Sequence, residues 1–292
     1  MIHFWKYLAF FFEVISVDVL ISFTCAFSLH DHPSVRSSPR CGIFKTHLPL
    51  LQAAAGQEMD SNIFIFRHQH ETLNYNAVVL RSEWVHTHLL RNHQKGNNLK
   101  RITQIVNDAY EVGEKGMWKG DDVQRTSDGD VLQKLQDEKL VLLLKDFDHQ
   151  DEGNSNASIL NNCYGCIYCD YNFGEGCCEL GMFAIDGTFR GVGLGSFLLG
   201  AAEIYASQKD CTNLRLELLS PVEYDHNFKK RLDEWYTKMN YRSDYVDQMN
   251  NFFKLQFSEI FDKLACSCKF HIYRKEISTD TLSTNAIKAT YD

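Results

Sequence analysis

The chain has 292 residues, of which 44% are hydrophobic and 13% aromatic, enough for one large domain or two small ones. Its formal net charge of −8 at pH 7 argues against nucleic-acid binding as the main task, because that task usually requires a basic patch. An acidic chain is compatible with a basic partner such as an amine.

Residues 1–60 form an apolar and then basic extension. Residues 4–29 are strongly apolar, but a transmembrane helix there would bury Glu13 and Asp18, at about 2.5–3.5 kcal/mol for a central Asp. A stable membrane span is therefore not favoured. The next twenty residues carry Ser, Arg and His and only Asp31 as an acid.

An apolar segment followed by such a stretch resembles a bipartite plastid presequence, which implies delivery to an organelle. A poorly ordered extension, or an artefact upstream of Met59, is the alternative, and the protein is then expected in the cytoplasm. The globular pattern begins near residue 61 and is expected to reach residue 277. Residues 278–292 are polar and read as a frayed tail.

The first part of the globular pattern mixes strand and helix signals. Residues 62–67 and 77–81 are both strand-like, and either is a candidate for the first strand. Apolar residues three and four apart predict helices over 98–114 and 128–138, the second with Asp128 as its N-cap. The predicted elements that follow are a strand over 139–145 and a polar loop over 149–162.

Residues 162–171 are predicted to form a strand that contains Cys163, Cys166 and Cys169. Positions three apart in a strand point to opposite faces, which favours buried core cysteines over a zinc site. A metal site completed by Cys266 and Cys268, or disulfides, remain the alternatives. A turn over 174–176 then leads into the next strand.

The spacing of apolar residues changes within the central stretch, residues 178–208. Residues 180–185 are a short apolar run typical of a buried strand. After a polar link comes Arg190-Gly191-Val192-Gly193-Leu194-Gly195, and then Leu194, Phe197, Leu198, Ala201, Ala202 and Tyr205 recur at helical spacing. Glycines at a helix start let backbone N–H groups approach an anion, and the helix dipole favours phosphate there.

The remainder continues the alternation of strand and helix. Leu214, Leu216 and Leu218 alternate with charged residues and predict a strand over 212–219. A helix over 228–239 and a final strand over 265–277 follow.

Three phosphate-binding templates compete for the glycine-rich turn. A Walker A loop fails because Gly195-Ser196-Phe197 contains no lysine, and a dinucleotide fingerprint fails because Ser196 stands where glycine is needed. The pattern Arg/Gln-x-x-Gly-x-Gly/Ala fits Arg190, Gly193 and Gly195. Here the sequence resembles the GNAT superfamily of acyl-CoA-dependent N-acetyltransferases; a glycine-rich turn without a ligand is the alternative.

The resemblance spans about residues 77–277 and implies an α/β (α+β) fold. That fold is a mixed, mostly antiparallel sheet, splayed near the cofactor strand, with helices on both faces. It also implies acetyl-CoA as cosubstrate, with no metal. The implied pyrophosphate site comprises Arg190, Gly191, Val192, Gly193, Leu194, Gly195 and Ser196. Backbone amides of Phe183, Ala184 and Ile185 are implied to hold the pantetheine arm and polarise the carbonyl.

The resemblance also supplies candidate catalytic residues. Glu179 stands at the start of the cofactor strand, where several relatives carry their general base, and simple alternation places it on one face with Gly181 and Phe183. Its reference pKa of about 4.3 is too low for a base at neutral pH unless burial or a relay water helps. A surface glutamate is the alternative.

Tyr236 matches the family tyrosine that protonates the coenzyme A sulfur, within a segment similar to the family's "FYEKLGY" element. A packing residue is the alternative. Many relatives carry Asn seven residues earlier, where this chain has Lys229. The resemblance also places Tyr110 and Trp118 at the start of the loop over the acceptor site, although both are equally suited to covering the core.

The sequence therefore predicts acetyl transfer from acetyl-CoA to a primary amine of a small molecule or peptide. One alternative keeps the chemistry but uses a protein N-terminus or a lysine as acceptor. Another is an acyl-CoA-binding module without turnover. Two loops, over residues 113–126 and 221–227, are expected to decide the acceptor.

Overall fold

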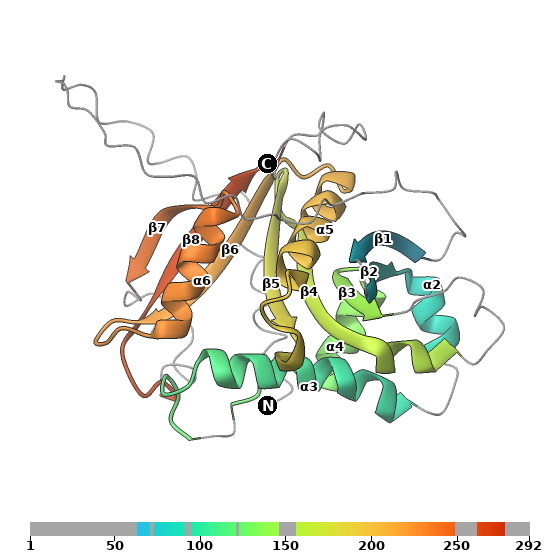
Figure 1. Cartoon of the computed structure of the whole chain (residues 1–292), viewed down its shortest axis with the longest axis horizontal. Helices are drawn as coiled ribbons and strands as arrows, with labels where there is room; N and C mark the ends of the chain where they lie inside the picture. The colour runs from blue at the N-terminus through green and yellow to red at the C-terminus, as the bar shows by residue number, and fades with distance from the viewer. Residues whose placement is uncertain are drawn as a thin grey trace, which may run out of the picture. The chain divides into compact units, whose positions relative to one another are not determined.

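The computed structural model describes residues 63–70, 73–90, 95–120, 123–145, 156–248 and 262–277. Within these residues the centre of the fold is an eight-stranded sheet in the order β1-β2-β3-β4-β5-β6-β8-β7 (Figure 1). Neighbouring strands are antiparallel except β5 and β6, which run parallel. The predicted mixed, mostly antiparallel sheet is confirmed.

The bounds of the elements follow the chain. The strands are β1 (Ile63–His70), β2 (Leu73–Leu80), β3 (Leu140–Lys145), β4 (Cys163–Gly174), β5 (Cys177–Ile185), β6 (Asn213–Pro221), β7 (Arg242–Gln248) and β8 (Cys268–Glu276). The helices are α2 (Ser82–Val85), α3 (Lys95–Gly113), α4 (Asp128–Gln136), α5 (Leu194–Gln208) and α6 (Asn227–Lys238), with a π-helical turn η1 (His86–Leu90) and 3-10 turns η3 (Asn156–Asn162) and η4 (Gly187–Phe189).

Most predicted elements are found close to their predicted bounds. The two candidates for the first strand are both strands, and they pair with each other as β1 and β2. The helix start at Asp128 is corrected by one residue, because Ser127 is the N-cap of α4 and forms a capping box with Asp130. Strand β7 and helix α2 were not predicted, and the end of the expected loop is the 3-10 turn η3.

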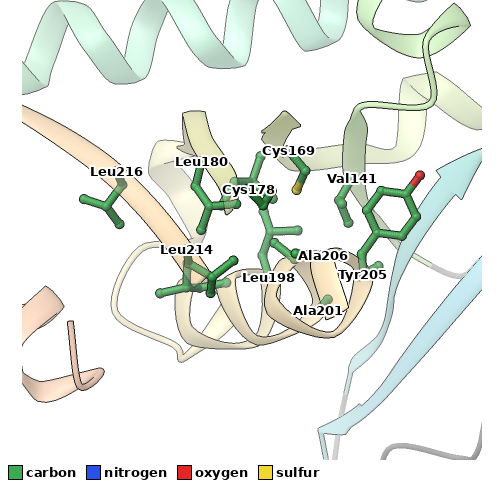
Figure 2. Close-up of a cluster of buried hydrophobic side chains, with 14 of the residues drawn as sticks. Val141, Cys169, Cys178, Leu180, Leu198, Ala201, Tyr205, Ala206, Leu214 and Leu216 are labelled. Atoms are coloured by element: carbon green, nitrogen blue, oxygen red, sulfur yellow. The ribbon is translucent and has the colours of Figure 1, made fainter. Parts of the chain in front are cut away.

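Helices cover both faces of the sheet. On one face, α5 buries Leu198, Ala201 and Tyr205 against β3, β4, β5 and β6, as Figure 2 shows. On the other face, α3 and α4 pack against β2, β3 and β4. Each face of the sheet therefore carries a hydrophobic core, and the predicted arrangement of helices is confirmed.

The cysteines of β4 are core residues, but their faces differ from the prediction. Cys163, Cys166 and Cys169 are all fully buried. Cys163 and Cys166 share the core beneath α3, whereas Cys169 lies in the α5 core. The pairing of β4 with β3 shifts register between Leu143 and Leu144. Because of this bulge, Cys163 lies on the same face of the sheet as Cys166.

A second bulge lies in β5, at Met182, which has a φ of 46°. The pairing with β4 shifts register there, so the alternation of faces reverses along β5. Leu180 lies in the α5 core and Met182 in the α3 core, and Phe183 packs against the α5 core. The prediction that Phe183 shares a face with Glu179 is therefore wrong, because simple alternation does not survive the bulge.

Strands β5 and β6 pair over four residues only, from Cys177 to Leu180 on β5. Beyond that point β6 stays paired with β8, while β5 stays paired with β4. The two strands diverge in Figure 1, which is the predicted splay. The C-terminal half of β5 thus has a hydrogen-bonding edge that no strand of the described residues occupies.

The predicted extension over residues 1–60 and the tail over 278–292 lie outside the described residues. In the part of the chain that is described, no helix combines the length and the hydropathy that crossing a bilayer demands.

Candidate active site

The glycine-rich turn connects the end of β5 to α5. Asp186 caps η4 by accepting a hydrogen bond from the Thr188 N–H at 2.9 Å, and its carboxylate also pairs with Arg101 of α3. Gly191 and Gly193 then adopt φ values of 83° and 86°. Only glycine adopts this left-handed conformation without strain, so both glycines are needed to turn the chain into α5.

The space above this turn is open. A Cβ atom added at Gly191 or Gly193 would meet no other atom within 4 Å. No side chain caps the first turn of α5, so its N–H groups face outward at the positive end of the helix dipole. The turn fits an anion such as a pyrophosphate, held by backbone amides.

The residues predicted to bind a pyrophosphate come together in this turn. Arg190, Val192 and the two glycines are exposed, and Ser196 is half-buried. Leu194 instead buries its side chain in the α5 core, so only its backbone is available. Arg190 lies over the ring of Phe228 of α6, 5.7 Å from the ring centroid.

The residues predicted to hold the pantetheine arm lie on the open half of β5. Ala184 and Ile185 pair with Cys166 and Gly165 of β4, whereas Phe183 follows the bulge and has no β4 partner. The ring of Phe183 stacks on Trp235 of α6, with centroids 5.7 Å apart. The Phe183 backbone N–H forms a hydrogen bond with the hydroxyl of Tyr110 from α3. Side chains from α3 and α6 thus meet at the splay.

Tyr236 is buried at this junction. Its ring packs against Trp235, Tyr241 and Tyr273, and burial, followed by the nearby Tyr110 hydroxyl, raises its pKa above the ordinary value. Its hydroxyl makes no hydrogen bond with any residue that the structure describes. Tyr236 therefore keeps its proton at neutral pH and has it available for a bound group.

Glu179 lies on the paired half of β5, opposite Arg215 of β6. Its carboxylate pairs with Arg215, which also pairs with Glu217. Burial raises the pKa of Glu179 to about 7, against the opposing effect of Arg215. The pKa suits a base at neutral pH, but the structure shows no interaction that joins Glu179 to Tyr236.

Four further residues form what we call the Glu114 cluster: Glu114, Trp118, Arg125 and Lys229. Glu114 is 3% exposed, and its carboxylate accepts from Arg125 Nε at 3.0 Å, Trp118 Nε1 at 2.8 Å and Lys229 Nζ at 3.3 Å. Burial opposes ionisation of Glu114, but Arg125 and Lys229 outweigh it and lower its pKa. The carboxylate is therefore charged at neutral pH.

This cluster adjoins the splay. The Arg125 guanidinium lies over the ring of Tyr110, 4.8 Å from its centroid, and over Trp118 at 5.3 Å. Sequence reasoning missed Glu114 and Arg125, because no local pattern connects them. Lys229 was visible only as a departure from the family's asparagine.

A backbone bridge joins two segments beside the Glu114 cluster. Trp118 pairs with Leu264, the Lys119 N–H donates to Lys263 O at 2.7 Å, and the Ala265 N–H donates to Met117 O at 2.9 Å. The loop after α3 is thereby joined to the segment before β8. This segment was not among the two loops expected to border the acceptor.

The described residues include no group of three or more His, Cys, Asp or Glu side chains that is placed to hold a metal ion. The described cysteines are free thiols.

Comparison with solved structures finds acetyltransferases at low sequence identity. One, from Desulfovibrio desulfuricans and assigned to the GNAT acetyltransferases, is 13% identical over 71% of this chain and 100% of that chain, with a TM-score of 0.40. An aminoglycoside 6'-N-acetyltransferase complexed with coenzyme A is 12% identical, over 64% of this chain and 95% of its own, with a TM-score of 0.42.

N-acetylglutamate synthase from Neisseria gonorrhoeae, complexed with coenzyme A and N-acetyl-glutamate, is 14% identical, with a TM-score of 0.40. That match covers 63% of this chain and 34% of the synthase. Curated protein sequences yield no significant match.

The sequence itself matches the model of one protein family over part of its length. Residues 121–233 match the model of the acetyltransferase (GNAT) family. The match includes Glu179, the bulged strand β5 and the glycine-rich turn, and it ends before Tyr236. Over these residues the chain is similar to the GNAT family of acetyltransferases.

Proposed function

We propose that the protein transfers an acetyl group from acetyl-CoA to a primary amine by direct attack. The observation that carries this proposal is the open glycine-rich turn at the start of α5, next to the splayed end of β5. There Phe183 contacts Trp235 and Tyr110, which are both neighbours of the buried Tyr236. These parts give an anchor for phosphates, an edge for an extended amide-containing arm, and a proton donor at its end.

The cofactor site follows the course of β5 into α5. Backbone amides from Gly191 to Ser196 would hold the pyrophosphate, with Arg190 assisting from the side. Backbone groups of Phe183, Ala184 and Ile185 would hold the pantetheine arm along the free edge of β5. Bound there, acetyl-CoA supplies the reactive thioester.

Tyr236 acts as the acid in this proposal. The amine nitrogen attacks the carbonyl carbon, the carbon–sulfur bond breaks, and the departing thiolate takes the proton of the Tyr236 hydroxyl. Burial raises the pKa of Tyr236, but the same desolvation raises the pKa of a thiol that departs beside it. The two groups therefore stay matched for proton transfer.

Glu179 receives the proton of the attacking amine. Its pKa of about 7 makes the carboxylate form available at neutral pH. Because Glu179 lies on the paired half of β5, a relay water would carry the proton from the amine to Glu179. Loss of the amine's proton directly to bulk water is the alternative.

Glu179→Gln tests this role through the pH profile. Since the pKa of Glu179 is raised, its basic form is present above about pH 7 and is lost as the pH falls through that value. The wild-type kcat/KM should therefore fall below about pH 7. The variant should be about 100-fold slower near neutral pH and approach wild type in alkali, where free amine is abundant.

Glu217→Gln is the matched control, because Glu217 pairs with the same Arg215. In Glu217→Gln, kcat/KM should still fall at low pH, but the fall should move to lower pH. The reason is that Glu217 raises the pKa of Glu179. A Glu179→Gln enzyme with the wild-type profile would remove this residue from the mechanism.

The overall function is tested by release of free thiol from acetyl-CoA, with mass spectrometry of the acceptor. Panels of polyamines, amino acids and peptides are offered to the purified full chain. Acetylation of small amines supports the proposal. Acetylation confined to peptides would identify a protein N-terminal or lysine acetyltransferase, and binding without thiol release would identify an acyl-CoA-binding module.

For residues 1–60 we propose a targeting role that delivers the protein to an organelle such as a plastid; without it the protein would remain cytoplasmic. We expect a chain of residues 61–292 to stay soluble and to bind acetyl-CoA, because a presequence contributes nothing to the core. Thermal melting with and without acetyl-CoA checks this. Loss of the folded state on truncation would show that the boundary near residue 60 is wrong.

A further inference from the structure

The Glu114 cluster contains two basic side chains and one acidic one. Burial lowers the pKa of Lys229, and the Glu114 carboxylate opposes that effect. Arg125 and Lys229 share one carboxylate, Glu114, and neither forms a salt bridge with a second acid of the described residues. Arg125 cannot lose its proton at any relevant pH. The local charge therefore opposes that of the chain as a whole, which is −8.

Lys229 is the member with unused hydrogen bonds. Its ammonium has three N–H donors, and its hydrogen bond in the described structure is the 3.3 Å contact to Glu114 Oε1, an oxygen that Arg125 also binds. Its side chain is 8% exposed, which leaves little access for water. A buried ammonium with donors to spare is stabilised strongly by an added anionic partner.

The position of Lys229 connects it with the reaction centre. Lys229 and Tyr236 are the two buried residues of α6, and they are seven residues apart, which places them on one face about 10 Å apart along the helix. On the other side, Arg125 lies over Tyr110, whose hydroxyl interacts with the Phe183 N–H. The excess charge thus lies beside the groups that would handle the thioester.

We propose that Lys229 binds a carboxylate of the amine acceptor, so that the substrates are amino acids or peptides rather than polyamines. This inference rests on the proposed acetyl transfer and specifies its acceptor. A carboxylate at Lys229 accepts hydrogen bonds from the unused N–H groups of the ammonium and balances the charge of the cluster. A polyamine would instead bring further positive charge to a buried site that already has an excess.

The first test uses the full wild-type chain and pairs of dipeptides that differ only in a free or an amidated C-terminus. The reacting amine is the same in each pair, so its basicity changes little. We expect kcat/KM for the free carboxylate to exceed that for the amide about tenfold or more, the size of a charge-assisted hydrogen bond. Polyamines should react more slowly than either.

The second test removes the charge. Lys229→Met keeps the aliphatic stem and should abolish the preference for the carboxylate, with a raised KM for the acid, an unchanged rate for the amide and unchanged affinity for coenzyme A. Lys229→Arg should keep the preference. Lys230→Met is the matched control, because Lys230 is the exposed neighbour on the same helix, and it should behave as wild type.

The outcomes separate this inference from the proposed function. Equal rates with acid and amide in a wild-type protein that acetylates both overturn the inference and leave the acetyltransferase. No thiol release with any amine overturns both. If Lys229→Met slows acid and amide equally or weakens coenzyme A binding, Lys229 holds the cofactor or the fold, and the inference is wrong.

Discussion

Gly193→Asp is expected to weaken coenzyme A binding at least about 100-fold. The new carboxylate would project into the open space where the pyrophosphate is proposed to lie, and like charges repel strongly there. The left-handed backbone at Gly193 also costs an L-residue about 1–2 kcal/mol. Calorimetric titration with coenzyme A measures the loss, and titration with pantetheine, which lacks the phosphates, should show a much smaller one.

Gly120→Asp controls for strain and added charge. Gly120 has a φ of 82°, and a Cβ there would also meet nothing within 4 Å, but it lies outside the turn. This variant should bind coenzyme A as wild type does. Arg190→Ala should weaken binding no more than about fivefold, because an exposed charge contributes about 1 kcal/mol or less. A folded Gly193→Asp protein that binds coenzyme A normally would contradict the proposed role of the turn.

Tyr236→Phe is expected to lower kcat by about 100- to 10,000-fold, the usual contribution of a general acid, with little change in coenzyme A affinity. The ring contacts with Trp235, Tyr241 and Tyr273 remain in the variant. The hydroxyl has no hydrogen-bond partner among the described residues, so its removal should not destabilise the fold. Steady-state rates and thermal melting check the two statements.

Tyr241→Phe is the control from the same aromatic group. The Tyr241 hydroxyl donates to Glu203 at 3.0 Å, so its loss should reduce stability by about 1–2 kcal/mol while kcat stays near wild type. This is the reverse of the pattern expected for Tyr236. Wild-type kcat in Tyr236→Phe would make Tyr236 a packing residue.

The core of the fold was predictable where local patterns are strong. Residues 180–205 carry an apolar run, a glycine-rich turn and a helical stripe in succession, and they form β5, the turn and α5 as expected. Each signal depends on neighbours a few residues apart, which the sequence displays directly. The same reasoning placed the open turn at the start of α5.

The bulges were not predictable in this way. Met182 adopts its positive φ because β5 must stay paired with β4 while it leaves β6, a requirement set by three strands at once. Nothing in the residues around Met182 announces this conformation, which is rare outside glycine. Simple alternation therefore gave the wrong face for Phe183.

The Glu114 cluster illustrates the limit for the site. Lys229 and Glu114 are 115 residues apart in sequence, and their contact exists only because the end of α3 and the start of α6 meet at the splay. Strand β7 escaped prediction for another reason, since its residues are mostly polar and lack a clear alternation. Contacts between segments that are distant in sequence, not local residue type, determine both the Glu114 cluster and strand β7.

The free edge of β5 has a consequence for solubility. A strand edge without a neighbour invites pairing with another polypeptide, and proteins protect such edges with side chains or helices. Here Tyr110 of α3 lies at the Phe183 N–H, and Trp235 of α6 stacks on the Phe183 ring. The two helices that border the proposed reaction centre thus also cover this edge. Truncating Tyr110 or Trp235 is therefore expected to lower the yield of soluble protein independently of its activity.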